Sequence, residues 1–186
     1  MTAQYGVSTL TSQRIVMGPG KVYTGTSKAN GCLGATMGGN ILEINRVFRD
    51  IRPDGALGKV KGFRYLENAE YSLTVKLMEL TEDIIYYALA GSSLAAHVIS
   101  GGDIGQQTQG NVYIGEVQLD LEIKGTTATT EANLVSIVLK NVLVEGPFTI
   151  NAPEGGPATV ELKFTAHYDA SALTTEPFSI TFTPVA

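Results

Sequence analysis

Residues 71–77 read Tyr-Ser-Leu-Thr-Val-Lys-Leu, and this stretch decides the fold. Apolar and polar side chains alternate strictly along it, as they do in a β-strand with one face in the core and the other in solvent. The same alternation recurs over residues 117–124, 159–168 and 178–183. It predicts antiparallel sheets, because the strands of parallel sheets are apolar on both faces.

Other stretches complete a mainly β pattern. Residues 134–144 carry apolar side chains on both alternating faces, which predicts a strand covered on two sides. Residues 40–48 predict a further strand. Residues 14–17 and 21–24 predict a strand pair around the turn Gly18-Pro19-Gly20.

One helix is predicted over about residues 81–90. Thr81 can cap its start, Glu82 and Asp83 favour the positive end of the helix dipole, and Gly91 can end it. Together these patterns predict a β-sandwich or β-barrel of about seven to nine antiparallel strands, with one flanking helix and long loops.

The length of 186 residues fits a single domain. We expect it to carry an N-terminal arm over residues 1–12, a long basic loop over 47–62, a loop over 91–110 and a C-terminal arm or strand over 169–186. Only 17% of the residues are charged, against about 25% in a typical domain. Low charge in a strand-rich chain has two interpretations: association through strand edges, which we favour, and an ordinary neutral domain.

Positive charge gathers in residues 46–64. Six of the thirteen Lys and Arg residues lie there with only Asp50 and Asp54 among them, which gives a local charge of +4. Residues 65–186 hold four basic and fifteen acidic residues, which gives −11. A basic loop on an acidic body suggests that one copy of the chain docks on another.

No pattern in the sequence indicates a catalytic, metal or cofactor site. His97 and His167 lie far apart and have no cysteine or carboxylate at ligand spacing, so we interpret both as solvated residues. The acidic balance disfavours tight nucleic-acid binding, and no apolar run is long enough to span a membrane. We therefore expect a protein that is not an enzyme and uses no cofactor.

The expected strand at 117–124 has an acidic polar face. Glu116, Asp120 and Glu122 occupy alternate positions and therefore share one surface. One interpretation is an ordinary solvated face. The other is that, repeated around a ring, it forms a channel wall to which DNA does not stick.

The order of these signals resembles the major tail, or tail tube, proteins of long-tailed (siphovirus-like) bacteriophages. Gly38-Gly39 leads into a strand, residues 54–62 read Asp-Gly-Ala-Leu-Gly-Lys-Val-Lys-Gly, and a long alternating strand and one helix follow. The likeness covers residues 15–90 and, more loosely, 157–182.

The resemblance implies a virion structural protein of the phage tail, assembled in the cytoplasm of the host. Proteins of this family are β-sandwich subunits that form stacked hexameric rings. Their strands close into an inner barrel with an acidic lumen, through which DNA passes without specific binding. The implied partners are further copies of the chain, the tape measure protein, and the tail terminator or baseplate proteins.

Carried over to this sequence, the resemblance assigns two sets of residues. The first would contact a neighbouring subunit or stacked ring: Arg49, Arg52, Asp54, Lys59, Lys61 and Arg64. The second would line the lumen: Glu43, Glu116, Gln118, Asp120 and Glu122. Two alternatives stay open: a tube protein of a tailocin or a contractile injection or secretion system, and a β-sandwich module that binds carbohydrate or a cell-surface ligand.

Overall fold

The alternating stretches form antiparallel strands, as predicted. The computed structural model describes residues 16, 18–28, 31–101, 113–122 and 134–183, so the expected arm at 1–12 lies outside the described residues. Within them it holds ten strands, one α-helix and one short 3-10 helix. In chain order they are β1 (Lys21–Thr24), η2 (Thr26–Lys28), β2 (Thr36–Asp50), β3 (Arg64–Leu77), α1 (Glu82–Ala88), β4 (Ser93–Ala95), β5 (Val98–Ser100), β6 (Ile114–Glu122), β7 (Leu134–Glu145), β8 (Ile150–Asn151), β9 (Thr159–Ala166) and β10 (Phe178–Phe182).

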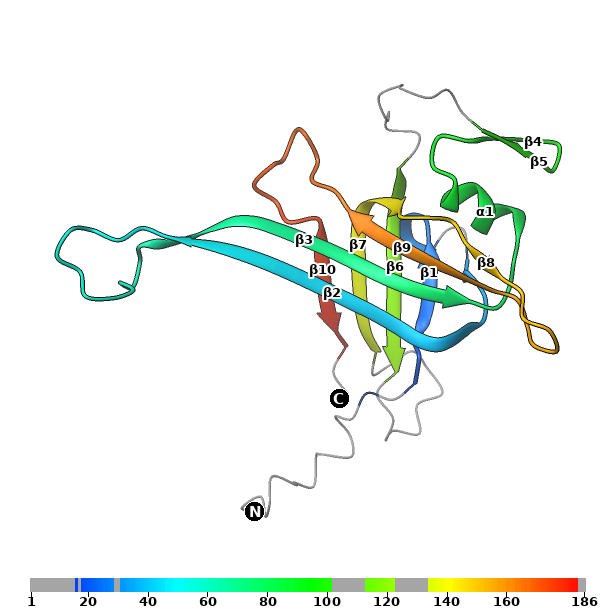
Figure 1. Ribbon diagram of the computed structural model, residues 1–186, viewed down its shortest axis with the longest axis horizontal. Helices are drawn as coiled ribbons and strands as arrows, with labels where there is room; N and C mark the ends of the chain where they lie inside the picture. The colour runs from blue at the N-terminus through cyan, green and yellow to red at the C-terminus, as the bar shows by residue number, and fades with distance from the viewer. Residues whose placement is uncertain (1–15, 17, 29–30, 102–112, 123–133, 184–186) are drawn as a thin grey trace, which may run out of the picture.

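Eight strands form one folded sheet in the order β1-β6-β7-β9-β3-β2, with β10 beside β7 and β8 beside β9. The strands β1, β6, β7 and β10 make one layer, and β2, β3, β9 and β8 make the other (Figure 1). The two ends of the sheet, β1 and β2, do not pair with each other. The architecture is therefore a sandwich with open edges rather than a closed barrel.

Strand β7 connects the two layers, because its last residues pair with β9 of the other layer. Residues 135–139 pair with β10, and residues 142–145 pair with β9. Asn141, between these two segments, has a φ of +49° and donates from its side chain to the carbonyl of His167 at 3.3 Å. Asn tolerates this left-handed conformation better than most residues, which lets one strand change layers here. The expected cover on both faces of β7 is incomplete: residues 135, 137, 139 and 142 are buried, whereas residues 136 and 138 on the other face are half-buried and residue 140 is exposed.

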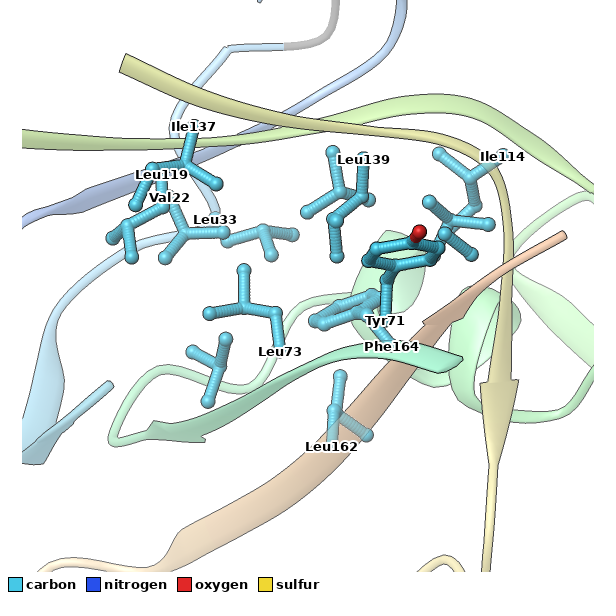
Figure 2. Packing of buried hydrophobic residues seen from close by; sticks show 14 of the residues in the cluster. Val22, Leu33, Tyr71, Leu73, Ile114, Leu119, Ile137, Leu139, Leu162 and Phe164 are labelled. Carbon is cyan, nitrogen blue, oxygen red and sulfur yellow. The ribbon is translucent and has the colours of Figure 1, made fainter. Parts of the chain in front are cut away.

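The core lies between the two layers (Figure 2). From one layer it receives Tyr71, Leu73, Leu162 and Phe164, and from the other Val22, Leu119, Ile137 and Leu139. Each of these residues occupies the apolar register of an alternating strand, so the period-two pattern places them on the inward faces. Full burial of each such side chain stabilises the fold by about 1.5–3 kcal/mol.

The expected helix is confirmed with nearly the expected bounds. Thr81 is its N-cap and accepts a hydrogen bond from the Ile84 amide at 3.3 Å, and Ile84 and Ala88 face the core. The expected loop after it is partly structured, because β4 and β5 form a separate short hairpin. The strand Lys21–Thr24 is also confirmed, and its described neighbours are β6 and the segment 31–33. Of the partner expected over residues 14–17, all but Val16 lie outside the described residues.

Candidate assembly surface

The hairpin of β2 and β3 extends far beyond the sandwich, and we call its outer part, residues 47–68, the arm (Figure 1). Strand β3 is buried at alternate positions from Ala69 onward, whereas its first five residues are all exposed. The strands stay paired as far as Asp50 and Arg64, so the basic loop spans 51–63 rather than the expected 47–62. Charged and apolar residues mix on both sides of the arm, which hides the strand period in the sequence.

A β-bulge determines which side chains share a face of the arm. Val47 pairs with Asn68 but Phe48 pairs with Leu66, so Glu67 is the extra residue. Successive pairs then alternate between two faces. The core-side face, which continues the buried side of the hairpin, carries Phe48, Asp50, Arg64 and Leu66, and the outer face carries Val47, Arg49, Ile51, Phe63 and Tyr65.

Two tight turns shape the tip of the arm. The amide of Ala56 donates to the carbonyl of Pro53 at 3.1 Å, and Gly55 has a φ of +86°. This confirms the turn expected at Pro53-Asp54-Gly55, where Pro fixes φ and Gly accepts the left-handed conformation. The amide of Phe63 donates to the carbonyl of Val60 at 3.2 Å in the second turn.

The charges of the arm are partly paired within it. Asp50 lies 3.1 Å from Lys59 and 3.3 Å from Arg64, and Arg49 lies 3.5 Å from Glu67. Arg64 also stacks over the ring of Phe48, with 4.5 Å between the guanidinium carbon and the ring centroid. Three of the six proposed contact residues, Arg49, Lys59 and Arg64, are thus paired with carboxylates of the arm itself. The other three, Arg52, Asp54 and Lys61, make no salt bridge to any residue that the structure describes.

The arm also exposes a large apolar surface, which was not predicted from the sequence. The exposed side chains are Val47, Phe48, Ile51, Leu57, Val60, Phe63, Tyr65 and Leu66. Leu57 at the tip is fully exposed. A group of apolar side chains of this size on a projecting element is typical of an interaction site. The sequence does carry a sign of this surface, because apolar residues are interleaved with the basic ones over residues 46–66.

A cluster of side chains holds the base of the arm to the sandwich. The guanidinium of Arg46 donates to the carboxylate of Glu176 at 2.6 Å and lies 5.7 Å from the ring centroid of Phe178. Phe178 in turn stacks on Tyr71, with 4.6 Å between the ring centroids. Burial raises the pKa of the Tyr71 hydroxyl, which therefore stays neutral. The start of β10 thereby fixes the direction in which the arm leaves the body.

The residues suggested for the lumen lie on two different surfaces. Glu43 is on the outer side of the β2–β3–β9 layer, where it lines an open hollow with Glu70 and Lys163. Glu116, Gln118, Asp120 and Glu122 share one face of β6 in the other layer, as the alternation predicts. The structure therefore does not bring Glu43 together with the β6 residues.

Lysines offset the acidic charge on β6. Glu122 lies 3.4 Å from Lys21, and Glu116 is directly across the β6–β7 ladder from Lys140. Asp120 is only 3% exposed and lies 2.6 Å from the ammonium of Lys28, in the 3-10 helix that covers it. By contrast, the hollow beside Glu43 is lined by two carboxylates, those of Glu43 and Glu70, and by one cation, Lys163.

Replacing Asp120 by Asn is expected to lower the free energy of unfolding by about 1.5–3 kcal/mol near neutral pH. Burial alone would raise the pKa of Asp120, but hydrogen bonds from Lys28, Ser136 and Gln118 outweigh it, and the pKa lies below its ordinary value of 3.8. The stabilisation is therefore present above that value and is lost as pH falls through the lower folded-state pKa. Urea titrations at several pH values should show the difference between wild type and variant shrinking in acid.

The matched control is Glu122→Gln on the same strand face. Its partner Lys21 and its own side chain are both more than half exposed, so the loss should be under about 1 kcal/mol. Equal losses for the two variants would contradict a structural role for the buried pair.

His97 is exposed, as interpreted, whereas His167 is only partly exposed, and each has a carboxylate nearby. Glu82 lies 2.6 Å from Nδ1 of His97 and raises the pKa of its ring, and Glu145 lies 3.5 Å from Nε2 of His167. Among the residues that the structure describes, no three His, Cys, Asp or Glu side chains are grouped so that they could hold a metal ion. None of the helical segments in the described part is long and apolar enough to cross a membrane.

The geometry defines an antiparallel β-sandwich with one projecting, apolar and basic hairpin. No family model and no curated protein matches the chain. Its structure is similar to that of the anti-feeding prophage cap, described as a tube-terminating cap, with a TM-score of 0.51, 12% sequence identity, and coverage of 98% of this chain and 95% of that one. The two proteins share the fold.

Two other solved structures are more distantly similar. The first is the tail of an empty GTA particle with C6 symmetry, with a TM-score of 0.41, 11% identity, and coverage of 89% of this chain and 96% of that one. The second is an Hcp protein, with a TM-score of 0.37, 13% identity, and coverage of 80% and 88%. Of the three, only the likeness to the cap is strong enough to define a shared overall fold.

Proposed function

We propose that this chain is the structural subunit of a phage tail tube, in which copies form stacked hexameric rings around a passage for DNA. The arm is the observation that carries the proposal. It exposes eight large apolar side chains on a projection with excess positive charge, and a side chain in that position is covered only when another molecule binds. The fold shared with a tube-terminating cap supports assembly into a tube as the context.

The body of the chain offers the complementary surface. Residues 69–186 carry a net charge of −10, against +2 in the arm, residues 47–68. Any single exposed ion pair adds less than about 1 kcal/mol, but a ring repeats each contact in every subunit. Arg49, Arg52, Asp54, Lys59, Lys61 and Arg64 remain the proposed contacts, with Arg52 and Lys61 the most available for a partner.

The passage for DNA needs a wall that does not bind phosphates. Among the proposed lining residues, Glu43 is supported by its neighbour Glu70 on an open surface. The β6 residues Glu116, Gln118 and Glu122 are the second proposed set, and the buried Asp120 supports their strand rather than adding free charge. The proposed site of action is the virion, with tape measure and terminator or baseplate proteins as further partners.

A tube or cap protein of a contractile injection system is the second candidate. The likeness to a tube-terminating cap favours the cap form of this candidate. The two candidates predict different particles, because a tube subunit stacks into many rings, whereas a cap forms one ring at a tube end.

Microscopy of the purified protein tests the proposal. We expect negative-stain images over a range of protein concentrations to show rings or stacked tubes. Single rings that bind only to the ends of preformed tubes would favour the cap. A chain that remains monomeric at every concentration, with and without other tail components, would refute both.

A further inference from the structure

The arm is apolar on both of its faces. Phe48 and Leu66 form one cross-strand pair on the core-side face, and Ile51 and Phe63 form another on the outer face. All four side chains are exposed. If the arm packed against a partner through one face only, its other face would stay in water. Strands in that situation carry apolar residues on the covered face and polar residues on the other. Apolar residues on both faces are instead typical of strands that are covered on both sides.

We propose that each arm is clamped between two other copies of this chain at once, one against each face. This inference rests on the proposed function, and it specifies the partner of the arm and the way in which assembly begins. Each face combines an apolar pair with an internal ion pair: Asp50 and Arg64 on the core-side face, and Arg49 with Glu67 beside the outer face. Each face thus presents its own apolar contact framed by charge, as a protein interface does.

Charge favours further copies of the chain as the occupants. The arm, residues 47–68, holds five basic and three acidic residues, a net charge of +2, whereas residues 69–186 hold four basic and fourteen acidic residues, a net charge of −10. Arg52 and Lys61 at the tip make no salt bridge within the described part of the chain. A partner that meets the arm should therefore present acidic groups, and the rest of this chain does so.

Clamping from two sides makes assembly cooperative. In a dimer, only one face of the arm is bound, and the apolar pair on the other face stays exposed. A dimer therefore buries only part of the apolar surface of the arm. A third copy completes the burial. Small oligomers should therefore be scarce, and growth should begin sharply above a threshold concentration.

Photo-crosslinking in assembled particles tests whether both faces are covered. A benzoylphenylalanine is placed at Phe63 on the outer face or at Phe48 on the core-side face, in particles made from a mixture of light and heavy isotope-labelled copies. We expect both positions to link to other copies, and each position to link to a different segment of the chain. No intermolecular product from one position, the same segment from both, or a link to a different protein would overturn the inference.

Paired substitutions test whether both faces matter to assembly. The variants are Ile51→Ser with Phe63→Ser, and Phe48→Ser with Leu66→Ser, and the control is Val98→Ser with Leu173→Ser, two exposed residues off the arm. We expect each arm variant to raise the threshold concentration at least about tenfold, and the control to change it less than about twofold. A variant that assembles like wild type would show that its face is uncovered. Absence of any particle from wild type would refute the proposed function, whereas particles with one bare face would refute only the clamp.

Discussion

Replacing residues 52–62 by Asn-Gly is expected to abolish assembly while the sandwich stays folded. The amide of Ile51 already donates to the carbonyl of Phe63 at 2.8 Å, so a two-residue turn can close the shortened hairpin. The change removes the tip with Leu57, Val60, Arg52 and Lys61 but no core residue. We expect the threshold concentration for pelleting to rise at least about 100-fold, which corresponds to about 2.8 kcal/mol.

A second hairpin supplies the matched control for this deletion. Asn151 and Thr159 are paired at the end of β8 and β9, and residues 152–158 between them can be replaced by the same Asn-Gly turn. Both variants should keep the thermal midpoint of wild type within a few degrees. Normal pelleting of the arm variant, or equal failure of both variants, would contradict the role of the arm.

Replacing Phe164 by Ala is expected to lower the free energy of unfolding by about 3–5 kcal/mol. Phe164 on β9 is completely buried between the layers, so truncation leaves a cavity as well as losing apolar contact. The whole stability of a domain is about 5–15 kcal/mol, so the variant should be close to unfolding at physiological temperature. Urea denaturation followed by circular dichroism measures the loss.

Phe182→Ala is the control, because it makes the same substitution at an exposed position. Phe182 is 66% exposed on β10, so its truncation should cost less than about 0.5 kcal/mol in the isolated chain. A similar loss at both positions would show that the layers do not pack around Phe164 as described.

The two expected results separate folding from assembly. Loss at Phe164 affects the core and therefore both properties, whereas loss of the arm tip affects only contacts between copies. Arg46 connects the two parts, because it ties the arm to Glu176 and Phe178 at the edge of the core. A firmly held base reduces the entropy that ordering the arm costs when a partner binds.

Much of the fold could be predicted from local patterns. Alternation from Tyr71 to Leu77 marked a strand whose inward face is fully buried, and Thr81 marked the start of the helix. Pro53 and Gly55 marked the turn at the tip of the arm. Each of these features depends on a few neighbouring residues, so the sequence alone contains the information.

The partners of these elements could not be predicted in the same way. The strand Lys21–Thr24 joins β6, about a hundred residues further along the chain, and no local pattern indicates that pairing. The arm extended further as a ribbon than expected, because its strand pairing does not need the apolar alternation that a core imposes.

By itself, the sequence determined the pattern of strands and helix and the side of each strand on which an apolar residue lies. It also determined the separation of positive from negative charge. All of these follow from residue type and spacing. Tertiary structure alone decided which faces are covered. Lys28 folds back over Asp120 and removes it from the surface, whereas Ile51 on the arm keeps about half of its surface exposed against the residues that the structure describes. Burial depends on what distant segments place against a side chain, and that geometry is set only when the whole sandwich has formed.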